Sequence, residues 1–271
     1  MPRISLSSAP RLQSMTGGAI VMGHVVVALM LREMKTRFGR DAGGYLWALI
    51  EPVMFIAALL LFKTAILGLA INDADTVANL AAGVLTFFLF RDIIQRAMTA
   101  VSGNRGLLMH PIVTPLDILL ARSLLEAATS LVVTCIIVGG IFVFWGEGLP
   151  AAPLALLGVL AVAASAGLSL GLVFGAAAAV WPVVERIVAP LLRISFFISG
   201  VFFIPASLPP ELREWLLWNP VLHITEAARA AWLSSPIETY GTLLYPVALA
   251  WILLPFGLAS ERLARSRVAP A

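Results

Sequence analysis

Six long apolar segments occupy most of this 271-residue chain, and their length limits what it can fold into. A bilayer core needs about 20 apolar residues per helical span, whereas barrel strands need only about 10 of alternating polarity. These segments are continuously apolar, so helices are predicted. Charged residues make up only 12% of the chain, about half the usual fraction in a soluble domain. We expect an all-α integral membrane protein whose six transmembrane helices cover residues 45–70, 77–98, 115–145, 154–180, 187–204 and 242–258. The fifth segment is short, so it either crosses the membrane or re-enters it.

Basic residues alternate between the two predicted sides of the membrane. Lysine and arginine concentrate in loops that stay in the cytoplasm. Six precede the first span, four lie in 91–122, two in 183–193 and three follow the last span. The intervening loops at 71–76 and 146–153 have none. This alternation predicts that both termini are cytoplasmic.

The N-terminal region ahead of the first span is predicted to lie on the membrane surface. Residues 19–31 are apolar but too few to span, and a basic stretch follows them. We predict a flexible arm at 1–18, an amphipathic interfacial helix at 19–40, a membrane domain at 41–262 and a cytoplasmic tail at 263–271. A signal peptide or a partial span is the alternative reading of the apolar run.

The chain lacks the common motifs of nucleotide hydrolysis and metal binding. A P-loop needs Gly-Lys followed by Ser or Thr, but the two lysines, Lys35 and Lys63, follow Met34 and Phe62. The three histidines are far apart, and the single cysteine, Cys135, is predicted to be a small core side chain. The net charge is only +3, and the basic residues are distributed as membrane topology predicts, so the charge does not indicate a nucleic-acid partner. We expect no catalytic site, metal or cofactor in this chain.

Charged and aromatic side chains inside the first two predicted spans mark a candidate substrate path. Charges in a bilayer usually face the bundle interior or a cavity. Asp92 and Arg96 are four residues apart and are expected to pair, whereas Arg91 and Asp92 are adjacent and should point in different directions. These residues either snorkel and pack the core, or line an entrance and conduit for an anionic substrate. The set is Glu51, Lys63, Phe87, Phe88, Phe90, Arg91, Asp92 and Arg96.

Segment 102–117, between the second and third spans, combines apolar residues, basic flanks and two prolines on the predicted cytoplasmic side. This pattern suits docking onto a soluble partner, with an ordinary connecting loop as the alternative.

The stretch 199–232 predicts short re-entrant or periplasmic helices before the last span. Pro209 and Pro210 can start a helix, and Glu211 and Glu214 favour its positive end. Tryptophans suit the membrane interface. The helices form either an external gate or an interfacial cap. The candidate gate residues are Phe202, Phe203, Pro205, Trp215, Trp218 and Asn219.

Four sequence blocks carry a family resemblance. They are Arg-Glu-Met-Lys-Thr-Arg-Phe-Gly at 32–39, Gly-Tyr-Leu-Trp-Ala-Leu-Ile-Glu-Pro at 44–52, Asn-Arg-Gly-Leu-Leu at 104–108 and the stretch 200–220. With these blocks the chain resembles the permease subunit of type-2 ABC exporters, and is most similar to the capsular polysaccharide branch. Asp41-Ala42-Gly43 departs from the more basic stretch expected there.

The resemblance implies a homodimer in the bacterial inner membrane with two copies of a separate ABC ATPase, which would bind ATP and magnesium. It implies that a lipid-linked anionic polysaccharide passes between the protomers to periplasmic adaptor and outer-membrane export proteins. The residues that it places against the ATPase are Arg32, Lys35, Arg37, Asn104, Arg105, Leu107, Leu108, His110 and Pro111. Export of O-antigen or teichoic acid is an alternative, and a membrane scaffold or lipid-modifying membrane enzyme is another of a different class.

Overall fold

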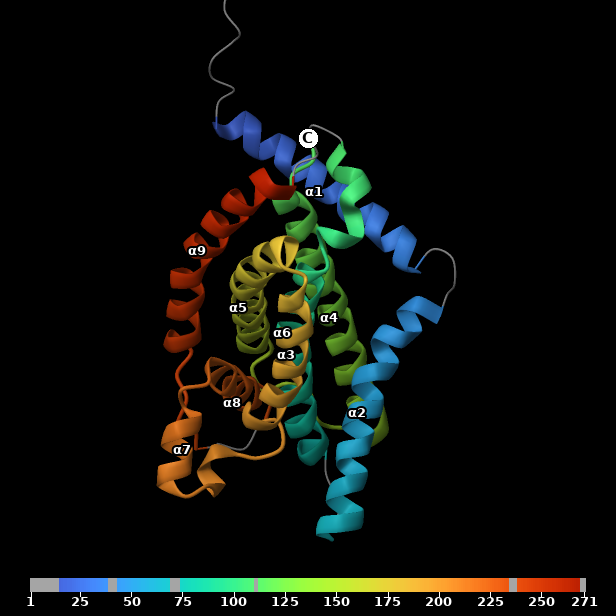
Figure 1. Cartoon of the computed structure of the whole chain (residues 1–271). Helices are drawn as coiled ribbons and strands as arrows, with labels where there is room; N and C mark the ends of the chain where they lie inside the picture. The colour runs from blue at the N-terminus through green and yellow to red at the C-terminus, as the bar shows by residue number, and fades with distance from the viewer. Residues whose placement is uncertain (1–14, 39–42, 69–73, 110–111, 234–237, 269–271) are drawn as a thin grey trace, which may run out of the picture.

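The computed structural model describes residues 15–38, 43–68, 74–109, 112–233 and 238–268, and the elements within them are all helical. Figure 1 shows one bundle of long helices with shorter helices at both ends. The elements are α1 (Met15–Phe38), α2 (Gly43–Leu67), α3 (Ala74–Met98), η1 (Ser102–Met109), α4 (Pro115–Trp145), α5 (Pro153–Val180), α6 (Val183–Ile198), η2 (Pro205–Ser207), α7 (Pro210–Leu216), α8 (Pro220–Trp232) and α9 (Leu244–Val268).

Five described helices are long and apolar enough to cross a membrane, namely α2, α3, α4, α5 and α9. The third predicted span matches α4 at both ends, where Thr114 forms a capping box and Gly146 closes the helix in a left-handed conformation. The fifth prediction is displaced, because α6 starts at Val183 and has only 16 residues. Hydropathy predicted a span through residue 204, but the chain leaves the helix after Ile198 and turns at Gly200.

The predicted flexible arm is too long, and the last helix extends beyond its predicted span, because hydropathy does not mark helix ends. α1 begins at Met15, so residues 15–18 of the predicted flexible arm are helical, while residues 1–14 and 39–42 lie outside the described residues. α9 continues to Val268, beyond the predicted end of the last span at 258 and into the predicted tail. Its polar end keeps the helix through an i,i+4 ion pair of 3.0 Å between Glu261 and Arg265.

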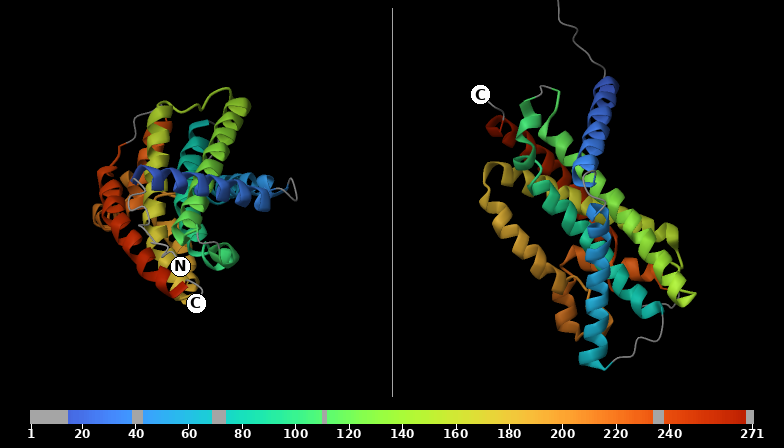
Figure 2. Two further views of the ribbon diagram at one scale, coloured as in Figure 1. Left: turned by 90° about the horizontal axis from the view of Figure 1, so that it is seen from above. Right: turned by 90° about the vertical axis from the view of Figure 1, so that its right-hand side faces the viewer.

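α3 is the central helix of the bundle, with most of its residues from Val77 to Met98 buried against α4, α5 and α8. α1 lies across the bundle at the end that carries the C-terminus, and Figure 2 shows this crossing from above. The short helices η2, α7 and α8 gather at the opposite end. Cys135 is exposed on α4, so its predicted core position is wrong: α4 turns this face away from the bundle.

A stripe of glycines on α5 lets its backbone touch that of α3. A Cβ added at Gly171 would lie 2.9 Å from Cβ of Ala97, and one at Gly175 would lie 2.9 Å from the Ala97 carbonyl oxygen. Gly167 meets the Phe90 carbonyl oxygen at 3.0 Å in the same way. Helices in membranes pack through such small-residue repeats, since lipid provides no hydrophobic drive for their association.

We predict that Gly171→Leu destabilises the bundle because its side chain has no space between α5 and α3. Overpacking of a core costs about 1–3 kcal/mol, which we expect to lower the melting temperature in detergent by about 2 to 12 °C. Gly158→Leu is the matched control, since Gly158 lies on the same helix and a Cβ added there would have no atom within 4 Å. Equal melting temperatures for both variants would contradict the close contact.

Candidate functional site

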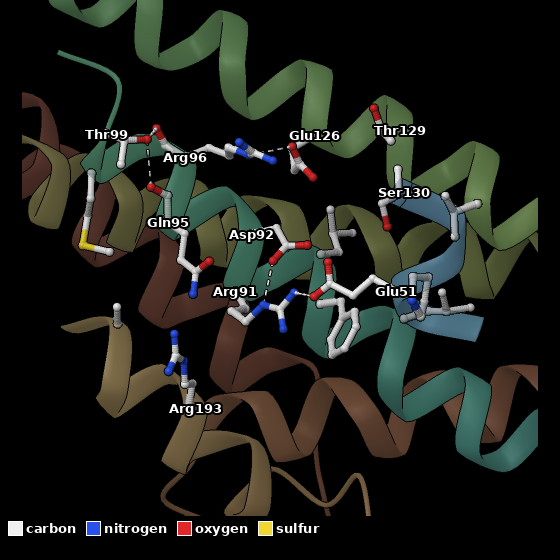
Figure 3. A pocket seen from close by; sticks show the side chains of 18 of the residues that line it. Glu51, Arg91, Asp92, Gln95, Arg96, Thr99, Glu126, Thr129, Ser130 and Arg193 are labelled. Carbon is white, nitrogen blue, oxygen red and sulfur yellow. Dashed lines mark hydrogen bonds and ion pairs between the residues drawn. The ribbon is translucent and has the colours of Figure 1, made fainter. Parts of the chain in front are cut away.

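A cavity of about 480 Å³ lies among α2, α3, α4 and α6, in the half of the bundle nearer η1. Its wall is charged and polar although these helices are otherwise apolar (Figure 3). Burying this many ionisable groups in a membrane bundle is unfavourable unless they pair or face water or a ligand. The polar lining residues are Glu51, Arg91, Asp92, Gln95, Arg96, Thr99, Glu126, Thr129, Ser130, Glu185 and Arg193.

Arg91 is the best-satisfied cation of the cavity. Its Nε donates to Oδ1 of Asp92 at 2.6 Å, and its Nη2 donates to Oε1 of Glu51 on α2 at 2.8 Å. The guanidinium also lies 4.0 Å from the ring centre of Phe88. The expectation that Arg91 and Asp92 point apart is therefore wrong. A long arginine can reach back to its neighbour when a second carboxylate fixes its other end.

Arg96 pairs across helices and not with Asp92 as expected. Its Nε lies 3.4 Å from Oε2 of Glu126 on α4. The i,i+4 rule predicts pairs on an isolated helix surface, but here α4 offers Arg96 a buried carboxylate. Glu126 is a functional candidate that sequence reasoning missed, and an acidic residue within the third apolar segment was the signal for it.

The candidate conduit residues separate into three groups. Those that line the cavity are Glu51, Phe88, Arg91, Asp92 and Arg96. Phe87 and Phe90 are buried in the core, at 1% and 4% exposure. Lys63 is partly buried near the far end of α2 and is not part of the cavity wall. The structure thus brings together the charged members of the set, except Lys63.

Phe196 of α6 is the centre of an aromatic cluster that sequence reasoning missed. Its ring makes edge contacts with Phe55, Phe87 and Phe202 at centroid distances of 5.0, 5.0 and 4.9 Å. Phe197 and Phe202 stack at 5.2 Å. These rings connect α2, α3, α6 and the turn after α6, between the cavity and the short helices at the opposite end. The run Phe196-Phe197 within an apolar segment was its only sequence signal.

The turn after α6 is held by side chains of α8. Asn219 caps α8 by accepting from the Val221 N–H at 3.0 Å, and its amide donates to the Ile198 carbonyl at 3.1 Å. Thr225 donates to the Ser199 carbonyl at 2.7 Å. The α6 terminus therefore obtains its missing partners from α8, which fixes the outer cap, defined here as residues 199–232.

Two further buried side chains of α8 complete the outer cap. Arg229 donates to the carbonyls of Val201 at 3.0 Å and Phe203 at 3.1 Å, and more weakly to that of Asn79 on α3 at 3.4 Å. His223 accepts from the Thr242 N–H through Nδ1 at 2.9 Å, so its Nε2–H donates to the Leu217 carbonyl at 2.7 Å. Both residues join the cap to neighbouring parts of the chain.

The candidate gate residues all lie in this outer cap but occupy different environments. Phe202 stacks in the aromatic cluster, Phe203 presents its carbonyl to Arg229, and Pro205 is buried. Trp215 and Trp218 are 78% and 76% exposed, as expected for rings at a membrane interface.

α1 and η1 form a joint surface at the end of the bundle that carries the C-terminus, and we call it the α1–η1 surface. Arg32 of α1 donates to Oδ1 of Asn104 in η1 at 3.2 Å, and the Asn104 amide donates to the Ala100 carbonyl at 3.0 Å. Arg122 of α4 pairs with Glu33 at 3.0 Å. α1 and η1 are thereby tied together and to the bundle.

The remaining candidates for partner contact differ in accessibility. Lys35 and Arg105 are exposed, whereas Leu107 and Leu108 are half-buried against an apolar cluster with Val26 and Leu29. Met109 and Ile112 are the more exposed apolar residues, at 69% and 67%. The side chain of Arg37, and His110 and Pro111, lie outside the described residues.

Among the residues that the structure describes, no group of three or more His, Cys, Asp or Glu side chains could hold a metal ion. The ionisable side chains of the cavity are instead engaged mainly in ion pairs.

Comparison with known proteins agrees with this architecture. The family described as ABC-2 type transporter matches residues 24–233. A polysialic acid transport protein of Escherichia coli, KpsM, is 32% identical over 90% of this chain and 95% of its own length. The capsule polysaccharide export inner-membrane protein CtrC of Neisseria meningitidis serogroup B is 30% identical, over 88% of this chain and 90% of its own. BexB of Haemophilus influenzae, with the same description, is 28% identical over the same shares. The chain therefore belongs to the ABC-2 type transporter family of membrane proteins.

Proposed function

We propose that this chain is the membrane-spanning subunit of an exporter that moves lipid-linked capsular polysaccharide across the inner membrane, driven by a separate ATPase. The observation that carries this proposal is the charged cavity inside a bundle of apolar helices. A polar, acidic polymer needs such a surface, since it cannot meet bare hydrocarbon. The full-length similarity to capsule export proteins supports the choice of polymer.

In this proposal α6 is the sixth span. It has 16 residues and so falls short of the bilayer core by a few residues, and the outer cap completes the crossing from the other side. The basic residues of the loops support a cytoplasmic position for both termini, α1 and η1. The cavity then lies in the cytoplasmic half of the membrane, where a polymer made inside the cell would enter.

Two copies of the chain and two ATPase subunits complete the proposed exporter. The ATPase, with its ATP and magnesium, docks on the α1–η1 surface, because this surface combines exposed cations with the exposed apolar side chains of Met109 and, just after η1, Ile112. Arg122 of α4 pairs with Glu33 of α1, and Arg32 of α1 bonds to η1, so motion of α1 and η1 would be transmitted to the bundle. Periplasmic adaptor and outer-membrane proteins receive the polymer beyond the outer cap.

We predict that Arg105→Glu uncouples the two subunits, because it places a negative charge on the exposed cation of η1. Surface polymer and co-purification of the ATPase should each fall by at least about tenfold, the loss produced by about 1.4 kcal/mol of binding energy. Arg213→Glu is the control, since it reverses the same charge on α7, at the opposite end of the bundle. Unchanged co-purification of the Arg105→Glu variant would argue against docking at η1.

The function itself is tested by deleting the reading frame in its native host. Capsule should disappear from the cell surface while polymer accumulates inside, and both changes should reverse on complementation with the intact chain. Loss of another surface glycan with normal capsule would refute the proposed substrate.

A further inference from the structure

The three arginines of the cavity differ in how they are satisfied. Arg91 contacts two carboxylates and Arg96 contacts one. Arg193 is an exposed residue of the same cavity wall, and it makes no ion pair or hydrogen bond with any residue that the structure describes. A guanidinium has five N–H donors in a fixed fork, so Arg193 holds unused capacity for binding an anion.

The position of Arg193 directs that capacity into the cavity. Figure 3 shows its side chain leaving α6 on the side of Gln95, apart from the group formed by Arg91, Asp92 and Glu51. Glu185 is the carboxylate on the same helix, but it lies eight residues earlier, about 12 Å along the axis. Glu185 also lines an adjoining hollow of about 360 Å³ with Arg105 at the η1 end. α6 therefore carries its carboxylate nearer η1 and its exposed, unpaired guanidinium about two turns further along the cavity wall.

An apolar groove along α2 joins the charged cavity. It shares Ala48, Glu51 and Arg96 with the cavity wall and continues over Trp47, Ile50, Met54, Phe55 and Ala58. A charged chamber that opens into an apolar groove fits an amphiphile, with a polar head inside and a hydrocarbon chain along the helix. The junction lies within the membrane-spanning part of α2, where acyl chains are the surrounding solvent.

We propose that Arg193 is a substrate-binding residue, which takes one oxyanion of the polymer near its lipid end. The guanidinium binds a sugar carboxylate or a phosphodiester in bidentate fashion. The Gln95 amide and the hydroxyls of Thr129 and Ser130 offer hydrogen bonds to sugar hydroxyls, and the lipid chain occupies the groove along α2. This assignment rests on the proposed export function and adds to it the residue and the chemical group that it recognises.

The test compares probe binding by the complete complex in nanodiscs, with its ATPase. One probe, α-2,8-linked tetrasialic acid, carries carboxylates and no phosphate, and the other, lysophosphatidylglycerol, carries a phosphodiester and no carboxylate. Arg193→Gln should weaken at least one by roughly ten- to a hundredfold, since a hydrogen bond to a charged group contributes about 1.5–3 kcal/mol. The affected probe identifies the oxyanion. Arg193→Lys should retain part of the binding, because it keeps the charge without the fork.

Arg186→Gln is the matched control, since Arg186 is equally classed as exposed on α6 and carries the same charge, but does not line the cavity. The methyl ester of tetrasialic acid and monoacylglycerol, which lack the charges, should bind equally to the wild type and to Arg193→Gln. Unchanged binding of both anionic probes to Arg193→Gln would overturn the assignment. In that case, capsule export by wild-type cells decides which proposal is wrong. If these cells export capsule, only the role of Arg193 is wrong; if they do not, the proposed function is wrong as well.

Discussion

Arg229→Ala should loosen the outer cap and lower the stability of the whole protein by about 3 kcal/mol or more. The Arg229 side chain is only 2% exposed and donates to three main-chain carbonyls, on Val201, Phe203 and Asn79. Its removal leaves a cavity and at least two well-bonded carbonyls without their charged donor, each a loss of about 1–3 kcal/mol. The melting temperature in detergent should fall by several degrees, and proteolysis within 199–219 should accelerate.

The control for this variant is Arg213→Ala. Arg213 is also in the outer cap, but it is partly exposed and contacts the Tyr240 ring at 3.9 Å. Such a contact contributes only about 0.5–1 kcal/mol. Arg229→Lys should recover little, because one ammonium cannot reach carbonyls on three segments in the way that a fork can. An Arg229→Ala protein as stable as the control would mean that Asn219 and Thr225 hold the cap without it.

Arg91→Ala should reduce export by at least about tenfold while leaving the ATPase bound. Arg91 balances Glu51 and Asp92 at 2.8 and 2.6 Å. Without it, two carboxylates face each other and the incoming acidic polymer across the cavity, with no cation in contact. The side chains of Asp92 and Glu51 are 25% and 57% exposed, so water screens this repulsion and the cost is smaller than that of breaking a fully buried pair. Surface polymer measured by antibody staining, together with ATPase co-purification, reports the two effects separately.

A compensating variant distinguishes charge balance from direct contact with substrate. Arg91→Ala combined with Glu51→Gln and Asp92→Asn removes the uncompensated carboxylates. Export that recovers in this triple variant identifies Arg91 as a residue that positions and neutralises its two neighbours. Normal export by Arg91→Ala alone would mean that Arg91 only contacts lipid headgroups and is not needed for transport.

Hydropathy predicted the spanning helices well, because long apolar runs in a bilayer have only one way to satisfy their main-chain groups. Hydropathy does not mark where a helix ends, because a helix can continue beyond the apolar run. α9 remains helical ten residues beyond the predicted end of its span at 258, through polar residues that still form the Glu261–Arg265 pair. α6 was misplaced because apolar residues after Ile198 belong to the turn that α8 holds.

The site could be predicted only in part, since its ion pairs cross between helices that are distant in sequence. Glu51 and Arg91 are 40 residues apart, and Arg96 and Glu126 come from α3 and α4. Local spacing favoured Asp92 with Arg96 and gave no information on Glu126. Arg193 was interpreted as a basic residue of a cytoplasmic turn. The predicted fifth span, which began at residue 187, was based on hydropathy alone and took no account of where this charge lies. Only packing shows that this arginine faces the cavity.

The claim that this chain is a passive path driven by another subunit is tested most directly by reconstitution. The chain would be reconstituted in proteoliposomes, with its cytoplasmic side facing out, in the presence and in the absence of its ATPase. Native lipid-linked polymer would be present in the outer leaflet. ATP hydrolysis and the polymer that becomes protected in the lumen would be measured together. We predict hydrolysis and protection only when both proteins and ATP are present. Hydrolysis by this chain alone, or equal protection without the ATPase, would contradict the claim.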